Sequence, residues 1–390
     1  MAEATHGVGG LTYDKNKRSW PNEANVFIAL ILLIGLFELI GHYRVGQSML
    51  FDFNTNRDGT ILNMARIKII ILQVSIIGII ALGVTQVIIT GGIDLSSGSV
   101  VGATAMIAMS FALTAEVNGN PNGRAIFLSE VDGEMVPTPW LHDLPVLVPI
   151  LVGLLCGIAA GVINGLLIAY TGIPPFIATL GMMVSARGVA NWWSEGNPVS
   201  FPTQAYTDLA NGNLIDALTF GLFSETWTMQ QVFNGQNPAV YFILLAIVFH
   251  FVMKHTLYGK HTYAIGSNEA AARMSGISVS RQKVLVYAIA GMLAGFAAIL
   301  LTSKNLTAQS GMGLIYELDA IAMAVIGGVS LAGGRGSILG TVLGAMIFGI
   351  IISGFTYLRL DAFYQEIVKG IIIVAAVVID QWRQKRATRS

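Results

Sequence analysis

Polar side chains interrupt the long apolar segments of this 390-residue chain at a few defined places. Gln86 and Thr90 lie four residues apart in one segment, and Asp94 follows in the stretch ITGGIDLSSGSVVG, which leads into the next segment. Charged and amide groups are costly in a bilayer, so they usually face a protein interior or a water-filled path. There they can exchange hydrogen bonds with a polar solute. The candidate pathway residues are Thr85, Gln86, Thr90, Asp94, Ser96, Asn164, Phe176, Thr179, Arg187 and Asn191.

Several of these residues have a purely structural alternative. The Gln86 amide could bond a neighbouring helix, and Asp94 could cap the helix that begins after it, instead of forming an inner gate or a solute contact. Phe176 could pack in the core instead of stacking against a solute. Arg187 could pair with a carboxylate or a carbonyl group instead of lining an outer vestibule. The sequence leaves both possibilities open at each position.

Two carboxylates open a later apolar segment. Glu317 and Asp319 lie in YELDAIAMAVIGG, at the expected start of a helix. Acidic residues in a first helical turn can cap it and interact favourably with the helix dipole. The functional alternative for this pair is an outer gate.

The composition is that of a polytopic membrane protein. Hydrophobic residues make up 54% of the chain and charged residues only 11%, whereas soluble domains carry about 25% charged residues. The mean hydropathy is +0.67. The formal net charge is zero, so the chain has no basic surface typical of nucleic-acid binding. The scattered histidines and the single cysteine do not have the spacing of a metal site.

The apolar segments are long enough to predict about ten transmembrane helices. A spanning helix needs about 20 largely apolar residues, and continuous runs of this kind exclude the alternating pattern of a β-barrel. We therefore expect an all-α fold. The predicted segments are 26–42, 67–90, 97–116, 143–170, 175–194, 238–254, 282–303, 317–333, 337–356 and 364–382.

The distribution of lysine and arginine predicts the topology. Basic residues cluster before the first segment, after the last one and in the loop 254–283. Because cytoplasmic loops are enriched in basic residues, both termini and this loop are expected in the cytoplasm. The predicted regions are a cytoplasmic tail at 1–25, a transmembrane domain at 26–382 with long external loops at 117–142 and 195–237, and a basic tail at 383–390.

The loop 254–283 also predicts a short helix on the cytoplasmic surface. Ser267 or Asn268 can cap it, and Glu269 in the first turn suits the helix dipole. The following alanines favour helix, Met274 provides an apolar contact, and Gly276 ends the helix. A helix of this kind can seat in a groove of another protein. The alternative is an ordinary loop helix without a partner.

This loop resembles the Glu-Ala-Ala loop of bacterial ABC-importer permeases. Four further stretches are similar to the permeases of the monosaccharide branch: GGIDLSSGS at 91–99, GVINGLLIAYTGIPPFIATLG at 161–181, YELDAIAMAVIGGVSLAGGRGS at 316–337 and IVKGIII at 367–373. The resemblance covers about residues 65–380 and implies a type II importer-like permease fold in the bacterial inner membrane. By the same resemblance the helix that docks on the ATPase contains Glu269, Ala270, Ala271, Met274 and Gly276.

The resemblance also implies partners. It suggests a homodimer in the lipid bilayer, a cytoplasmic ABC ATPase that binds ATP and magnesium, and a periplasmic binding protein for ribose-, xylose-, galactose- or inositol-type substrates. This chain itself would hold no cofactor and would not be an enzyme, and it has no GxxxxGK[ST] motif. Residues expected to dock the binding protein or to gate the outer side are Arg57, Arg66, Arg124, Glu317, Asp319 and Arg359.

Two other classes of membrane protein fit the sequence less well. An ion-coupled secondary transporter of a small polar solute, the main alternative, would need carboxylates at mid-span. Glu38, Asp94 and Asp380 all lie near the ends of predicted segments. A membrane-embedded enzyme would need a nucleophile, a metal site or an acid pair within the spans.

Overall fold

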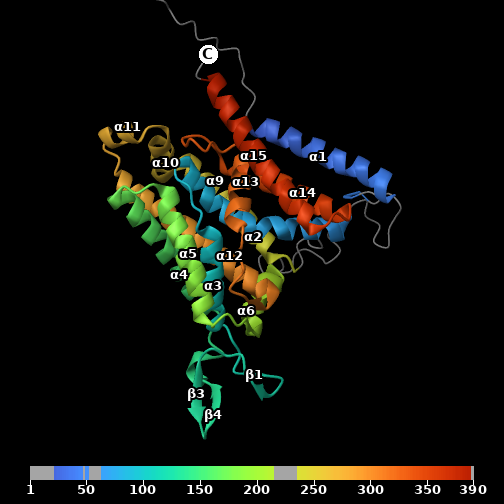
Figure 1. The fold of residues 1–390 in the computed structure, drawn as a ribbon, viewed down its shortest axis with the longest axis vertical. Helices are drawn as coiled ribbons and strands as arrows, with labels where there is room; N and C mark the ends of the chain where they lie inside the picture. The colour runs from blue at the N-terminus through green and yellow to red at the C-terminus, as the bar shows by residue number, and fades with distance from the viewer. Residues whose placement is uncertain (1–21, 47–48, 52–62, 215–234, 388–390) are drawn as a thin grey trace, which may run out of the picture.

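The structure is a computed structural model that describes residues 22–46, 49–51, 63–214 and 235–387, and this part of the chain is mostly helical (Figure 1). The helices are α1 (Asn22–Val45), α2 (Met64–Ile89), α3 (Ser97–Ser110), α4 (Leu147–Leu166), α5 (Pro175–Trp193), α6 (Gln204–Asn211), α9 (Asn237–His255), α10 (Leu257–Ser267), α11 (Glu269–Met274), α12 (Val279–Asn305), α13 (Tyr316–Ile326), α14 (Ile338–Tyr357) and α15 (Ala362–Ala387). A π-helical turn, Leu167–Thr171, extends α4, and a 3-10 turn spans Pro139–Leu141.

Each predicted apolar segment overlaps a described helix, but the helices differ in their ability to span a membrane. Six described helices are long and apolar enough to cross one, namely α1, α2, α4, α9, α12 and α14. Helix α3 has 14 residues and α13 only 11, which is less than the predicted lengths. Helix α13 stops at Ile326 because Gly328 adopts a left-handed conformation with φ of 89°. Six described helices therefore qualify as spans by length and composition, and the predicted ten crossings are not confirmed.

Hydrogen bonds gather several helix ends at one end of the bundle. The Gly334 amide donates to the Ile89 carbonyl over 2.8 Å, which joins the break after α13 to the break after α2. At the start of α14, the Ser337 hydroxyl donates to Glu23 of α1 over 2.7 Å. Tyr263 of α10 donates to the Gly336 carbonyl. The break after α2 and the break after α13 are therefore in direct contact.

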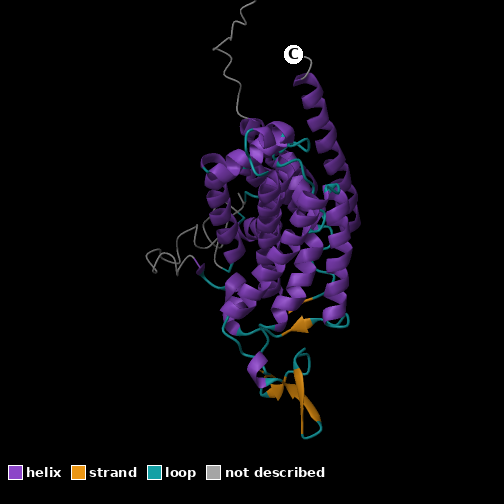
Figure 2. Cartoon of the chain, turned by 90° about the vertical axis from the view of Figure 1, so that its left-hand side faces the viewer, coloured by secondary structure: helices purple, strands orange, loops and turns teal. Residues whose placement is uncertain are grey.

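The short strands lie at the opposite end of the bundle (Figures 1 and 2). Three antiparallel pairs are described: β1 (Glu116–Val117) with β2 (Asn120–Pro121), β3 (Leu128–Val131) with β4 (Glu134–Pro137), and β5 (Val199–Ser200) with β6 (Thr307–Ala308). The first two pairs form hairpins between α3 and α4, in and next to the predicted loop 117–142. In Figure 1 the hairpins are at the bottom, whereas α11 and the C-terminal end of α15 are toward the top.

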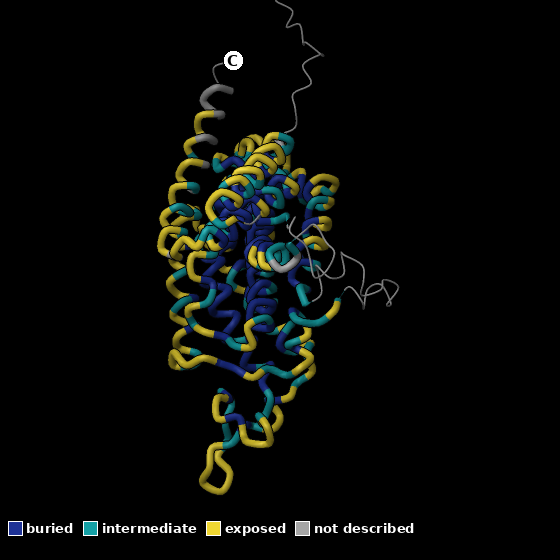
Figure 3. Tube along the Cα trace, turned by 90° about the vertical axis from the view of Figure 1, so that its right-hand side faces the viewer, coloured by how far each residue is buried: buried dark blue, intermediate teal, exposed yellow. Residues whose placement is uncertain are grey.

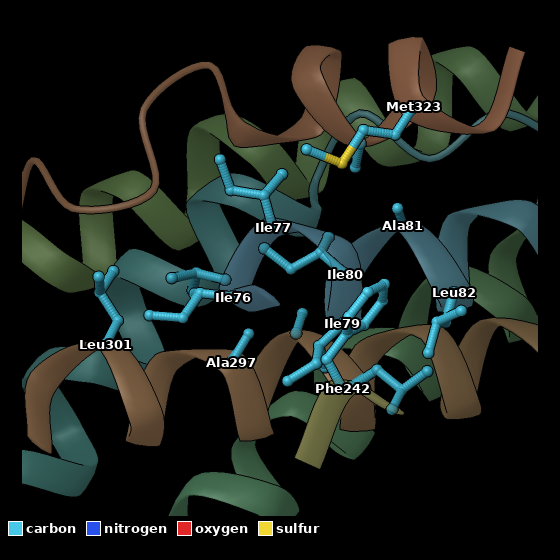
Figure 4. Close-up of a cluster of buried hydrophobic side chains, with 14 of the residues drawn as sticks. Ile76, Ile77, Ile79, Ile80, Ala81, Leu82, Phe242, Ala297, Leu301 and Met323 are labelled. Carbon is cyan, nitrogen blue, oxygen red and sulfur yellow. The ribbon is translucent and has the colours of Figure 1, made fainter. Parts of the chain in front are cut away.

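The core surrounds α2 and the α4–α12 contact. Ile79 and Ile80 of α2 are fully buried, and Figure 4 shows the α2 isoleucines between Ala297 of α12 and Met323 of α13. Buried residues fill the interior of the bundle, and exposed residues cover its outside (Figure 3). Helices α4 and α12 can approach closely because Gly161 has no side chain, since a Cβ atom there would overlap the Tyr287 carbonyl oxygen.

Candidate functional site

The break between α2 and α3 contains a buried carboxylate. Asp94 Oδ1 accepts hydrogen bonds from the Ser96 amide over 2.8 Å and from the Ser96 hydroxyl over 2.6 Å. Helix α3 begins at Ser97, and its N-cap residue is Ser96. Capping of this helix by Asp94, one of the two alternatives for this residue, is therefore not observed. The carboxylate instead orders the turn from Asp94 to Ser96 that precedes the helix, because aspartate side chains readily bond a backbone amide two residues on.

Three further helices bring polar groups to this break. The Asn164 amide of α4 donates to the Ser96 hydroxyl over 2.9 Å, and the Thr179 hydroxyl of α5 donates to the Ile93 carbonyl over 3.3 Å. Tyr287 of α12 donates to the same carbonyl over 3.4 Å. We call Asp94, Ser96, Asn164, Thr179 and Tyr287 the break cluster. Four of the predicted pathway residues belong to it, and Tyr287 was missed because its run of small and apolar neighbours is typical of a packing helix.

The break cluster is recessed from the ends of the helices that form it. Thr179 lies four residues after Pro175, where α5 begins, which corresponds to about 6 Å along the helix. Asn164 lies before the end of α4, which continues as a π-helical turn to Thr171. The Oδ1 atom of Asn164 and the hydroxyl of Ser97 are buried and have no hydrogen-bond partner in the described part of the protein. Asn164 of the break cluster and the adjoining Ser97 can thus form further hydrogen bonds.

A second polar group lies against the next turns of α3. Arg187 donates to the carbonyl oxygens of Ser310, over 2.5 Å, and Met312, over 2.9 Å. A Cβ atom at Gly102 would be 2.8 Å from Arg187 Nη1, and one at Gly98 would be 2.0 Å from a carboxylate oxygen of Glu317. The glycine face of α3 therefore packs against two charged groups on successive turns, Glu317 at Gly98 and Arg187 at Gly102. Of the alternatives for Arg187, pairing with carbonyl groups is the one observed.

Asp319 forms a buried ion pair with a residue that sequence reasoning did not single out. Lys369 of α15 places its Nζ 3.1 Å from Asp319 Oδ2, and the Asp319 side chain is only 4% exposed. The N-cap position of α13 is Ile315, without a side-chain capping bond, so capping by Glu317 or Asp319 is not observed. Lys369 interrupts the apolar run IVKGIII, and that position could have signalled a buried pair.

The remaining candidate pathway residues lie outside the break cluster. Thr85 bonds Thr341 of α14 over 2.7 Å, and Gln86 accepts from Tyr258 of α10 over 2.7 Å, so both join α2 to neighbouring helices. Thr90 bonds its own helix through the Val87 carbonyl. Phe176 and Asn191 are exposed on α5.

The short helix predicted in the loop 254–283 is confirmed. Helix α11 spans Glu269–Met274, the Asn268 side chain accepts from the Ala271 amide over 3.0 Å, and Gly276 has φ of 84°. Ala270 and Ala271 are exposed, and Met274 is 90% exposed. The exposed Met274 side chain thus gives α11 an apolar end on the surface of the protein.

Helix α11 is fixed to α12 by charge. Glu269 accepts from Lys283 over 2.7 Å and from Arg273 over 3.1 Å. The hydrogen bond from Lys283 is the main cause that holds the pKa of Glu269 below its usual range. A cavity of about 290 Å³ lies beside these three residues and is bordered on its other side by Pro174 and Pro175. The base of α11 is thus adjacent to the start of α5, the helix that carries Thr179.

The predicted docking arginines occupy separate places. The Arg66 guanidinium lies 5.2 Å from the ring centre of Tyr357 at the end of α14, and Arg359 is exposed just beyond that helix end. Arg124, in the loop between α3 and α4, lies 5.8 Å from the ring centre of Phe201. Arg57 lies outside the described residues.

Comparison with known proteins identifies the family. Residues 66–377 match the model described as a branched-chain amino acid transport system / permease component. The chain belongs to this permease family. It is 41% identical over 321 residues to the ribose import permease protein RbsC of Bacillus subtilis, with 82% of this chain and 84% of that protein covered. No solved structure matches the chain.

Two more relatives have related names. The galactose/methyl galactoside import permease protein MglC of Haemophilus influenzae is 35% identical over 326 residues, covering 83% of this chain and 88% of the relative. The ribose import permease protein RbsC of Escherichia coli K12 is 33% identical over 380 residues, covering 97% and 99%. Together with the six apolar helices, these relatives show a multi-pass protein of the bacterial inner membrane. It is a permease component of an ABC importer.

Proposed function

We propose that this permease forms the translocation pathway for a monosaccharide or a related polyol. The observation that carries the proposal is the break cluster, in which a discontinuity between two helices presents unpaired hydrogen-bonding groups inside an apolar bundle. Transporters commonly place solute contacts at such breaks. A sugar hydroxyl both donates and accepts, so it suits the free acceptor of Asn164 and the hydroxyl of Ser97. The sugar-importing relatives support this class of solute.

We further propose the assembly that the sequence predicts. Two copies of the chain would enclose the pathway, a cytoplasmic ABC ATPase would bind ATP and magnesium, and a periplasmic sugar-binding protein would dock on the hairpin end. Both termini and α11 would then face the cytoplasm. The position of α11 and the α15 end away from the hairpins supports this orientation (Figure 1).

The proposed coupling runs from α11 to the break cluster. Movement of the ATPase would displace α11, whose Glu269 is bonded to Lys283 of α12. The same helix, α12, contributes Tyr287 to the break cluster four residues later. The neighbouring start of α5 leads to Thr179. A shift of these two helices would therefore rearrange the polar groups around Ile93 and change access from one side to the other.

The decisive experiment is uptake by reconstituted proteoliposomes. The permease would be combined with its ATPase and binding protein, and labelled ribose, galactose and leucine would be offered with and without ATP. We expect ATP-dependent uptake of a sugar and no uptake of leucine, which tests the amino-acid class named by the family description. Uptake by the permease alone, driven by an ion gradient, would favour the secondary-transporter alternative and contradict the proposal.

A further inference from the structure

A large cavity lies at the hairpin end of the bundle and is separate from the break cluster. Its volume is about 660 Å³, which is within the usual range of small-molecule sites. Two segments form it, the turn before β3 and the turn after α5. The polar and aromatic side chains that line it are Arg124, Trp193, Ser194, Glu195 and Asn197. We call this cavity the outer-end pocket.

Several contacts hold the walls of the outer-end pocket in place. The indole nitrogen of Trp193 donates to the Ser110 hydroxyl at the end of α3 over 2.8 Å, which fixes the ring. Glu195 adopts a left-handed conformation with φ of 52° in the tight turn that follows α5. In that turn, the Ser194 hydroxyl donates to the Asn197 carbonyl over 2.6 Å. The Arg124 guanidinium lies over the Phe201 ring. The pocket is therefore preorganised rather than a gap between loose loops.

The lining determines the chemical class of the ligand. Arg124 and Glu195 contribute one positive and one negative charge, so the wall favours neither an anion nor a cation. No ion pair joins these two side chains among the described residues, which leaves both available to hydroxyl groups. The Asn197 amide adds a donor and an acceptor, and the Trp193 indole adds an aromatic surface. This combination fits a neutral, polyhydroxylated molecule of monosaccharide size.

The position of the pocket connects it to the pathway. Trp193 ends α5, whose inner part carries Arg187 and Thr179, and Ser110 ends α3, whose inner part begins at the break cluster. The same two helices thus carry polar groups from the outer-end pocket to the recessed cluster. On the basis of the proposed function, we propose that the outer-end pocket is an acceptor site that holds a neutral monosaccharide before it enters the pathway.

Direct binding measurements on the purified permease in nanodiscs test this site. Saturation-transfer difference NMR would be recorded with D-ribose and D-galactose as probes, for the wild type and for Trp193→Ala, Glu195→Gln and Asn197→Ala. We expect each substitution to weaken sugar binding by about tenfold, since each removes a main contact. Trp140→Ala is the matched control, because Trp140 is a 75% exposed tryptophan in the turn Pro139–Leu141 that does not line the pocket, whereas the ring of Trp192 packs edge-on against Trp193. Its affinity should equal that of the wild type.

The outcomes separate this inference from the proposed function. Glu195→Gln and Asn197→Ala alter exposed side chains, so unchanged melting temperatures would exclude misfolding. If the wild type imports sugar with its partners but binds none in nanodiscs, or if the variants bind as well as the wild type, the acceptor site is overturned and the transport function stands. If the variants lose only affinity for the binding protein, the pocket is a docking site for that protein and the inference is also overturned. Absence of ATP-dependent sugar import by the wild type would instead reject the proposed function.

Discussion

The polar groups inside the bundle and those of α11 have similar chemistry but different surroundings. Asp319 pairs with Lys369 in a site where the carboxylate side chain is 4% exposed, whereas Glu269 pairs with Lys283 although its side chain is 42% exposed. Buried charges depend on their partner, because the protein supplies the only compensation for lost hydration. Exposed charges have water as an alternative. We therefore expect substitutions in the bundle to affect folding, and substitutions in α11 to affect coupling.

The largest effect is expected from breaking the buried ion pair. Lys369→Met leaves the Asp319 carboxylate without its cation and should lower the free energy of unfolding by about 3–5 kcal/mol. Thermal unfolding of the purified permease measures this loss. The double substitution Asp319→Asn with Lys369→Met removes both charges and should recover most of the stability. Equal destabilisation by the single and double variants would show that the ion pair is not the cause.

The break cluster gives the next effect. Asp94→Ala removes both hydrogen bonds to Ser96, which share the single acceptor atom Oδ1, and should cost about 1.5–3 kcal/mol, the range for one hydrogen bond to a charged group. Asp94→Asn keeps an acceptor oxygen for the Ser96 amide, so it should fold like the wild type. If the carboxylate acts by ordering the turn, import by Asp94→Asn should stay within about threefold of the wild type, a difference of less than 1 kcal/mol. Equally poor import by both variants would show instead that the charge itself is required.

Substitutions in α11 should separate coupling from folding. Glu269→Gln weakens the attachment to α12, and Gly276→Ala forces a side chain into a conformation with φ of 84°. Both should reduce sugar-stimulated ATP hydrolysis by about tenfold, while binding-protein docking persists and stability falls by only about 1 kcal/mol. Arg281→Gln, which removes an exposed cation of the same loop, is the control. Wild-type coupled hydrolysis in both α11 variants would contradict the assigned role.

The smallest effect is the pH dependence of the Glu269 pairing. The pKa of Glu269 is lowered in the folded protein from an unfolded value of 4.5. Its contribution is therefore fully present above pH 4.5 and is lost as the pH falls through the folded-state pKa. The stability difference between the wild type and Glu269→Gln should be at most about 1 kcal/mol at pH 7, because the carboxylate is partly exposed. This difference should shrink in acid. A stability difference that grows below pH 4.5 would contradict a lowered pKa for Glu269 in the folded protein.

The comparison also shows where sequence reasoning succeeded. Asn268 and Gly276 mark the two ends of α11. They could be predicted because capping and helix termination act over three or four residues, so the neighbouring residues in the sequence determine them. The same local reasoning failed at Asp94. The sequence SSGS after it offers several cap positions, and the Asn164 bond to Ser96 links the structure there to a helix 68 residues away. Glu317 similarly packs against Gly98, a contact that no local pattern indicates.

The sequence by itself determined that the chain is a helical membrane protein, where its apolar segments lie, and where α11 begins and ends. These properties depend on composition and on interactions between near neighbours. Only the tertiary structure decided which partner each polar group bonds, that the two glycine-rich breaks touch, and that Lys369 neutralises Asp319. Those outcomes depend on which helices lie side by side. That arrangement follows from the packing of the whole bundle, to which every helix contributes.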